Sequence, residues 1–162
     1  MFKSVALIFF AAMILFFPQT SSANSKAYEE KLKAIETSKN ACMDKAEGVT
    51  SEMLECFGKS YKEYDTLLNE SYKHLRTAVE KDTPYYEALR TEQLAWIKLN
   101  KAVIDNVYKN GGGGTIDQVI AASAAAKIIT NRIELLIYCL TLGGSKPPAL
   151  AGSFSISSPE CL

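Results

Sequence analysis

The chain has 162 residues, a length that suits one domain, and its 18 basic residues balance its 18 acidic residues. Nothing in this interleaved charge argues for nucleic acid or an anionic membrane as a partner. The single histidine, His74, has no second histidine beside it, and the sequence holds no nucleotide-binding, hydrolase or zinc motif. We therefore expect no enzyme, no metal and no cofactor.

The N-terminus has the pattern of a secretory signal peptide. Lys3 supplies a positive charge, residues 5–17 are almost purely apolar, and small residues stand at Ser21 and Ala23. An uncleaved membrane anchor is the alternative, but the apolar run is shorter than the roughly 20 residues that span a bilayer. The pattern predicts export, with cleavage after Ala23 and no membrane contact afterwards.

The next part of the chain predicts two helices joined at a glycine. Residues 25–46 carry sparse apolar positions among Lys and Glu, which indicates an outer helix that ends at Gly48. Thr50 and Glu52 are typical of the start of a second helix. Its apolar residues recur in steps of three and four, a spacing that no strand could present. They are Met53, Phe57, Tyr61, Tyr64, Leu68, Tyr72, Leu75 and Val79.

Two further helices are expected around a run of four glycines. Thr83 followed by Pro84 predicts the start of a third helix, which we expect to run to about residue 110. The glycines at 111–114 indicate a flexible link, with a binding loop as the alternative; no Lys-Ser/Thr pair follows to favour a phosphate-binding loop. Thr115 and Gln118 predict a capping box that starts a fourth helix. That helix should end near residue 142.

Four cysteines in an exported domain predict two disulfides. Cys42 lies six residues before Gly48 and Cys56 lies eight residues after it, so the two face each other in a helical hairpin that turns there. By elimination, Cys139 pairs with Cys161. The second bond would tether the Gly-, Ser- and Pro-rich tail, which shows no periodicity.

Polar residues beside the apolar stripes form the candidate site, since they fall on three helices that could converge. These residues are Asp65, Asn69, Tyr72, Gln93, Trp96 and Arg132. One interpretation is a buried hydrogen-bond network that fixes helix register, because an unpaired buried polar group costs roughly 1–3 kcal/mol. The other is a ligand-binding cleft, and the sequence leaves both open.

The same residues resemble the signature of the lysozyme inhibitor LprI-like family, whose members are small exported helical bacterial domains. The similarity covers roughly residues 42–136, and the first two cysteines resemble the family's first cysteine pair. The matching segments are Asp65-x-x-Leu68-Asn69-x-x-Tyr72, Leu89-x-x-x-Gln93-x-Ala95-Trp96-Ile97 and Arg132-Ile133-Glu134-Leu135.

This chain departs from the family pattern at two places. Where the family often has Arg-Asp after the tryptophan, this chain has Asn100 and Lys101. Ile104 and the alanines around Ala122 stand where the family often has a further cysteine pair. The midpoint of those two positions is residue 113, so they would face each other across the glycine hairpin. We therefore expect this hairpin to lack a disulfide that the family often has.

The sequence therefore predicts an all-α fold, a disulfide-stapled antiparallel bundle of four helices. Residues 1–23 are the signal peptide, 24–142 the helical domain and 143–162 the tail. The resemblance implies an exported, periplasmic or secreted binding protein that inhibits lysozyme. The candidate binding loop, which would enter the glycan cleft of the lysozyme, consists of Asn110, Gly111, Gly112, Gly113, Gly114 and Thr115.

The alternative function is a periplasmic interaction or envelope-stress module without lysozyme activity. It would bind another envelope protein or a peptide along a helical groove. An exposed aromatic patch among Tyr85, Tyr86 and Tyr108 would favour this alternative.

Overall fold

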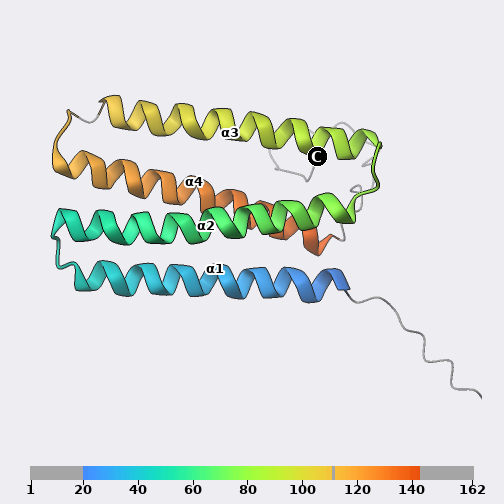
Figure 1. The fold of residues 1–162 in the computed structure, drawn as a ribbon, viewed down its shortest axis with the longest axis horizontal. Helices are drawn as coiled ribbons and strands as arrows, with labels where there is room; N and C mark the ends of the chain where they lie inside the picture. The colour runs from blue at the N-terminus through green and yellow to red at the C-terminus, as the bar shows by residue number, and fades with distance from the viewer. Residues whose placement is uncertain (1–19, 111, 143–162) are drawn as a thin grey trace, which may run out of the picture.

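The computed structural model describes residues 20–110 and 112–142, with side chains from residue 24 onward. The regular structure in these ranges is helical: α1 (Thr20–Lys45), α2 (Thr50–Ala78), α3 (Pro84–Asn110) and α4 (Thr115–Thr141). Helices that are consecutive in sequence run antiparallel (Figure 1). The predicted all-α antiparallel bundle is confirmed, whereas the predictions for residues 1–19 and 143–162 lie outside the described residues.

Two helix starts differ from the predicted caps. α2 begins at Thr50 itself, and Val49 precedes it without a side-chain capping bond. At α4 the N-cap residue is Gly114, whose N–H donates to the Asp117 carboxylate at 2.9 Å. The predicted box of Thr115 and Gln118 is therefore wrong by one residue, since Asp117 occupies the third helical position. A glycine cap supplies no side chain, so only half of the box forms.

The start of α3 agrees with its sequence pattern. The Thr83 hydroxyl accepts a hydrogen bond from the Tyr86 N–H at 3.2 Å, and it donates to the Glu80 carbonyl at 2.8 Å. Pro84 takes the first helical position, where its missing N–H costs nothing.

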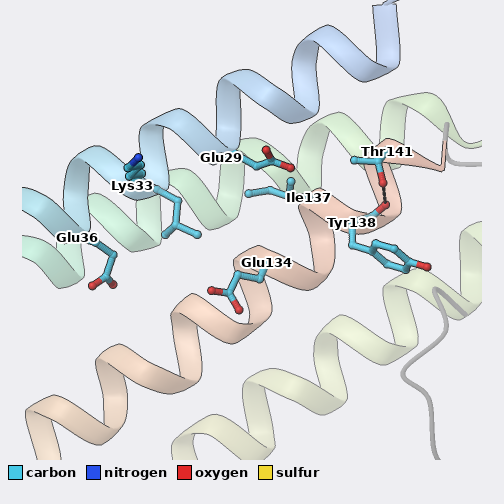
Figure 2. A pocket seen from close by; sticks show the side chains of 8 residues that line it. Glu29, Lys33, Glu36, Glu134, Ile137, Tyr138 and Thr141 are labelled. Atoms are coloured by element: carbon cyan, nitrogen blue, oxygen red, sulfur yellow. Dashed lines mark hydrogen bonds between the residues drawn. The ribbon is translucent and has the colours of Figure 1, made fainter.

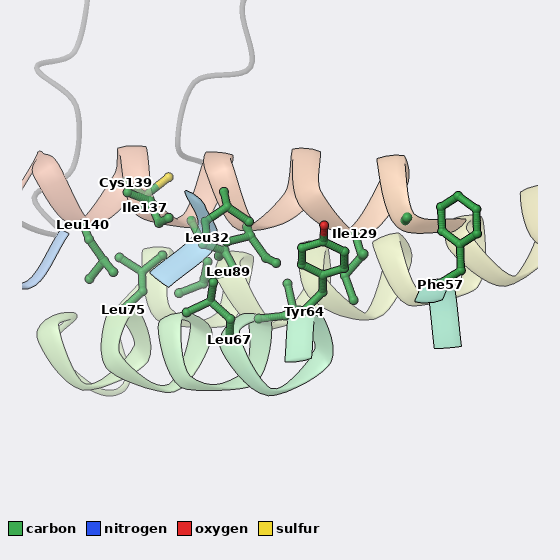
Figure 3. Close-up of a cluster of buried hydrophobic side chains, with 14 of the residues drawn as sticks. Leu32, Phe57, Tyr64, Leu67, Leu75, Leu89, Ile129, Ile137, Cys139 and Leu140 are labelled. Carbon is green, nitrogen blue, oxygen red and sulfur yellow. The ribbon is translucent and has the colours of Figure 1, made fainter. Parts of the chain in front are cut away.

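The core forms around α4, which packs against all three other helices and most extensively against α2. Apolar side chains of α1, α2 and α4 fill the space between them (Figure 3). α3 contacts α4 and buries only Leu89 and Gln93 along its length. Its large side chains Leu94, Ile97 and Leu99 are exposed. The described residues thus form a three-helix core to which α3 is attached mainly through α4.

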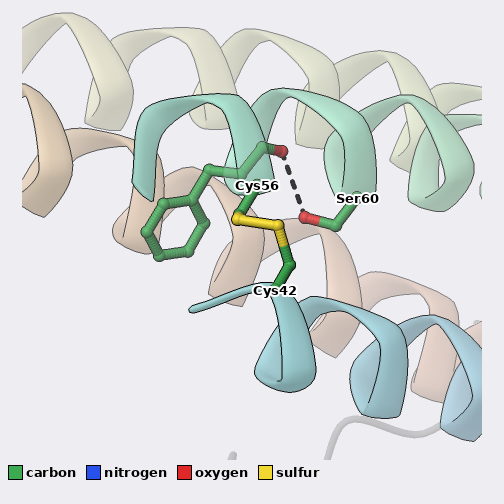
Figure 4. The surroundings of a disulfide bond; sticks show 4 residues. Cys42, Cys56 and Ser60 are labelled. Atoms are coloured by element: carbon green, nitrogen blue, oxygen red, sulfur yellow. Dashed lines mark hydrogen bonds between the residues drawn. A yellow bond between two sulfur atoms is a disulfide. The ribbon is translucent and has the colours of Figure 1, made fainter. Parts of the chain in front are cut away.

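A disulfide between Cys42 and Cys56 joins α1 to α2, with the two Cα atoms 5.7 Å apart (Figure 4). Gly48 turns the hairpin with a φ of +83°, a backbone conformation that favours glycine. This pairing confirms the prediction. Cys139 is buried and disulfide-bonded, but Cys161 lies outside the described residues, so their pairing stays a prediction.

Replacing both Cys42 and Cys56 with serine should lower the free energy of unfolding by about 3 kcal/mol, the value typical of a loop of about 15 residues. The reason is that the unfolded chain regains freedom between α1 and α2. Urea titration followed by circular dichroism measures the loss. A loss under about 1 kcal/mol would show that packing alone fixes this hairpin.

Candidate functional site

Arg132 is the centre of a buried polar cluster between α3 and α4. The residue is 4% exposed, and its Nε and Nη2 donate to Gln93 Oε1 at 2.9 and 2.8 Å. Its Nη1 donates to Glu92, and its guanidinium lies 6.0 Å from the centre of the Trp96 ring. The buried charge is tolerated because a carboxylate and an amide oxygen satisfy it.

The predicted residues on α2 do not join this cluster. Asp65 and Asn69 are exposed, and the Asn69 amide donates within its own helix, to the Asp65 carbonyl at 2.8 Å and carboxylate at 3.2 Å. Tyr72 is half-buried and accepts a hydrogen bond from Arg76. The expected convergence of three helices is therefore wrong. Tyr64 lies on the face of α2 that packs into the core, whereas the next residue, Asp65, lies on the face exposed to solvent.

Changing Gln93 to leucine should lower the free energy of unfolding by roughly 1–3 kcal/mol, because the Arg132 guanidinium loses its buried acceptor. The matched control is Asn69→Leu on the exposed face of α2, which should change it by no more than about 0.5 kcal/mol. Thermal and urea unfolding measure both variants. Equal losses in the two variants would contradict this assignment.

A second polar cluster, at Glu36 between α1 and α2, was not predicted. Tyr64 is fully buried and its hydroxyl donates to the Glu36 carboxylate, which also accepts from Lys39. Burial opposes ionisation of Glu36, but the hydrogen bonds from Lys39 and Tyr64 outweigh it and lower the pKa of Glu36. Burial, and then the bond to Glu36, raises the pKa of Tyr64. Sequence spacing treats Tyr64 as one apolar stripe residue and gives no signal for its partner on another helix.

Glu36 lies in a groove between α1 and α4. One part of the groove has a volume of about 450 Å³, and Figure 2 shows Glu29 and Lys33 on its α1 side and Glu134 and Tyr138 on its α4 side. A neighbouring part of about 330 Å³ shares Glu36 and Glu134. Carboxylates and ammonium groups alternate along this groove, so it carries no strong charge of one sign.

The Glu36 contacts make part of the stability pH-dependent. The pKa of Glu36 is lowered from its ordinary value of 4.5, so its stabilising effect is complete above about pH 4.5 and is lost as the pH falls through the lower folded value. Glu36→Gln should therefore be less stable than the parent near pH 7, and the difference should shrink toward about pH 3.

Melting temperatures of the parent and of Glu36→Gln across this pH range test the expectation. Glu29→Gln is the control, because Glu29 is an exposed carboxylate of the same helix that makes neither contact. A difference between parent and Glu36→Gln that stays constant with pH would contradict it.

The candidate loop lies between α3 and α4, at the same end of the bundle as the α1–α2 turn (Figure 1). Asn110, Thr115 and residues 112–114 are exposed, while Gly111 lies outside the described residues. Gly112 and Gly113 have φ values of +33° and +80°, a backbone conformation that residues with side chains rarely adopt. The exposure is what a binding loop requires, and its role stays a prediction.

Large exposed side chains flank this loop. Tyr108, in the last turn of α3, is 60% exposed, and Ile116, in the first turn of α4, is 56% exposed. The Asp117 carboxylate holds the Gly114 backbone on the α4 side. The loop is therefore joined to α4 at a capped helix start, and an exposed apolar side chain lies on each side of it.

The three tyrosines whose exposed patch would favour the alternative function do not lie together. Tyr85 and Tyr86 begin α3 and Tyr108 ends it, a separation of about 33 Å along the helix at 1.5 Å per residue. Tyr86 is half-buried with the Arg76 guanidinium 3.8 Å from its ring centre, and the Tyr85 hydroxyl is buried. These three residues therefore form no exposed aromatic patch, and the alternative function gains no support from them.

Neither metal binding nor membrane crossing finds support in residues 20–110 and 112–142. No group of three or more His, Cys, Asp or Glu side chains in these ranges could hold a metal ion. No helix there is both long and apolar enough to cross a bilayer.

Comparison with protein families shows where the chain belongs. The family model of lysozyme inhibitor LprI matches residues 42–136, more than half of the chain. The chain belongs to the LprI family. A search of curated proteins and a search of solved structures found no match. The LprI range contains the Arg132 cluster and the glycine loop, whereas Glu36 and most of α1 precede it.

Proposed function

We propose that the chain is an exported, periplasmic lysozyme inhibitor and not an enzyme. The LprI match over residues 42–136 carries the proposal. The signal-peptide pattern in the first 23 residues supports export. Among the described residues, Asn110 and residues 112–115 are exposed at one end of the bundle, as a binding loop requires.

The proposed mechanism is occlusion of the glycan cleft by residues 110–115. A glycine loop lacks side chains, so its backbone N–H groups approach a partner closely and can donate to carboxylates in the cleft. Tyr108 and Ile116 would become buried on the walls of the cleft. Because the chain is neutral, charge adds little to the encounter rate with a basic lysozyme, and the affinity depends on these contacts.

Replacing Gly111–Gly114 with a two-residue turn whose second residue is glycine keeps the N–H that Asp117 accepts at the start of α4. This variant should lose inhibition while its helicity and melting temperature stay nearly unchanged. Halving the loop length changes its closure entropy by only about 0.6 kcal/mol. Lysis of bacterial cell walls by chicken-type and goose-type lysozyme, with inhibitor at micromolar concentration, measures the effect. Leu94→Glu is the control, since Leu94 is exposed on α3 far from the loop, and it should inhibit fully.

The second candidate is a periplasmic interaction module that binds an envelope protein without lysozyme activity. The exposed Leu94, Ile97 and Leu99 on α3 favour it, because large apolar side chains on one helix suit a protein partner. A parent chain that inhibits neither lysozyme would overturn the first proposal and favour this one. Loss of inhibition in Leu94→Glu but not in the loop variant would move the lysozyme site to α3.

A further inference from the structure

A cationic pocket of about 380 Å³ lies where α2 ends and α3 begins. This is the end of the bundle opposite the glycine loop (Figure 1). Its charged lining residues are Lys73, Arg76 and Lys81, beside the rings of Tyr72 and Tyr86, and no carboxylate lines it. Three positive charges in one concavity, on a chain of zero net charge, indicate a site for an anion.

Arg76 is held in place without an acidic partner. Its Nη1 donates to the Tyr72 hydroxyl at 3.1 Å, and its guanidinium stacks 3.8 Å from the centre of the Tyr86 ring. The ion pairs among the described residues do not include Arg76. Arg132, by contrast, donates to Glu92. The Arg76 guanidinium therefore keeps donors for a ligand in an orientation already fixed by two tyrosines.

The last turn of α2, which supplies Arg76 and Thr77, and the first turn of α3, which supplies Tyr86, both border the pocket. The partial charges of these two helix ends are opposite in sign, so the positive potential comes from the three cationic side chains. Three acidic residues lie near the pocket, Glu80 and Asp82 in the connection and Glu87 in the first turn of α3. All three are exposed, and none of them lines the pocket. The pocket lining is therefore cationic, although acidic residues lie close to it in sequence.

We propose that this pocket binds a phosphate group, either as a free soluble ligand or as part of a lipid headgroup. The planar guanidinium of Arg76 donates to two phosphate oxygens, and Lys73 and Lys81 balance the second negative charge. A carboxylate carries one charge and would leave two cations of the lining unbalanced. The site is separate from the loop proposed to bind lysozyme, so neither proposal depends on the other.

Titration of the purified chain with inorganic phosphate near pH 7.5 at low salt, followed by backbone amide chemical shifts, tests the proposal. Saturable shifts around residues 73–86 are expected, with a Kd on the order of 1 mM or lower. Acetate should bind at least about tenfold more weakly. Arg76→Gln should weaken phosphate binding at least about tenfold. The matched control Arg90→Gln removes the same charge from an exposed α3 position outside the pocket and should leave binding unchanged.

The absence of saturable phosphate binding, equal effects of Arg76→Gln and Arg90→Gln, or tighter binding of acetate would overturn the proposal. If circular dichroism shows that Arg76→Gln does not fold, Lys81→Gln replaces it, since Lys81 lies in the exposed connection. Vesicles containing phosphatidic acid distinguish the sources of phosphate. Vesicle binding that free phosphate competes away assigns a lipid headgroup, and phosphate binding without vesicle binding assigns a soluble ligand. Vesicle binding that free phosphate does not displace would overturn the proposed site.

Discussion

The packing of α4 against α1, α2 and α3 is the constraint on which the arrangement depends. α3 buries only Leu89 and Gln93, so apolar burial alone gives it a weak hold on the core. The Arg132 cluster supplies the specific contact, because a buried guanidinium is costly unless Glu92 and Gln93 stand opposite it. That requirement sets one register between α3 and α4, and hence the position of both ends of the glycine loop.

The two hairpins at the loop end are held by different means. The α1–α2 hairpin has a covalent link between Cys42 and Cys56. The α3–α4 hairpin has half-buried Ile104 and Ala122 where the LprI family often has a cysteine pair, so side-chain packing and the Asp117–Gly114 bond hold it instead. A loop framed by non-covalent contacts keeps more freedom to adjust to a partner, at an entropic cost when it binds.

Much of the fold could be predicted from the sequence, because helix period, glycine breaks and cysteine spacing are local patterns. The site was predicted only in part. Periodicity identifies which residues share a face but locates its edge poorly: Tyr64 is fully buried, while Asp65, one residue and about 100° further round the helix, is exposed. The Tyr64–Glu36 bond joins residues 28 apart on separate helices, and no local pattern encodes such a contact.

The proposed phosphate pocket and the proposed lysozyme loop lie at opposite ends of α3, a helix of 27 residues and therefore about 40 Å long. Charges exposed to solvent are screened over about 8–10 Å at physiological ionic strength, so an anion at Arg76 does not act on the loop through its field. Coupling would have to pass through α3 itself, whose register the buried Arg132 cluster fixes. A ligand can shift a helix only if a second arrangement of that helix has a similar energy. Because the Arg132 cluster allows one register of α3 against α4, binding at the phosphate pocket should not affect binding at the loop.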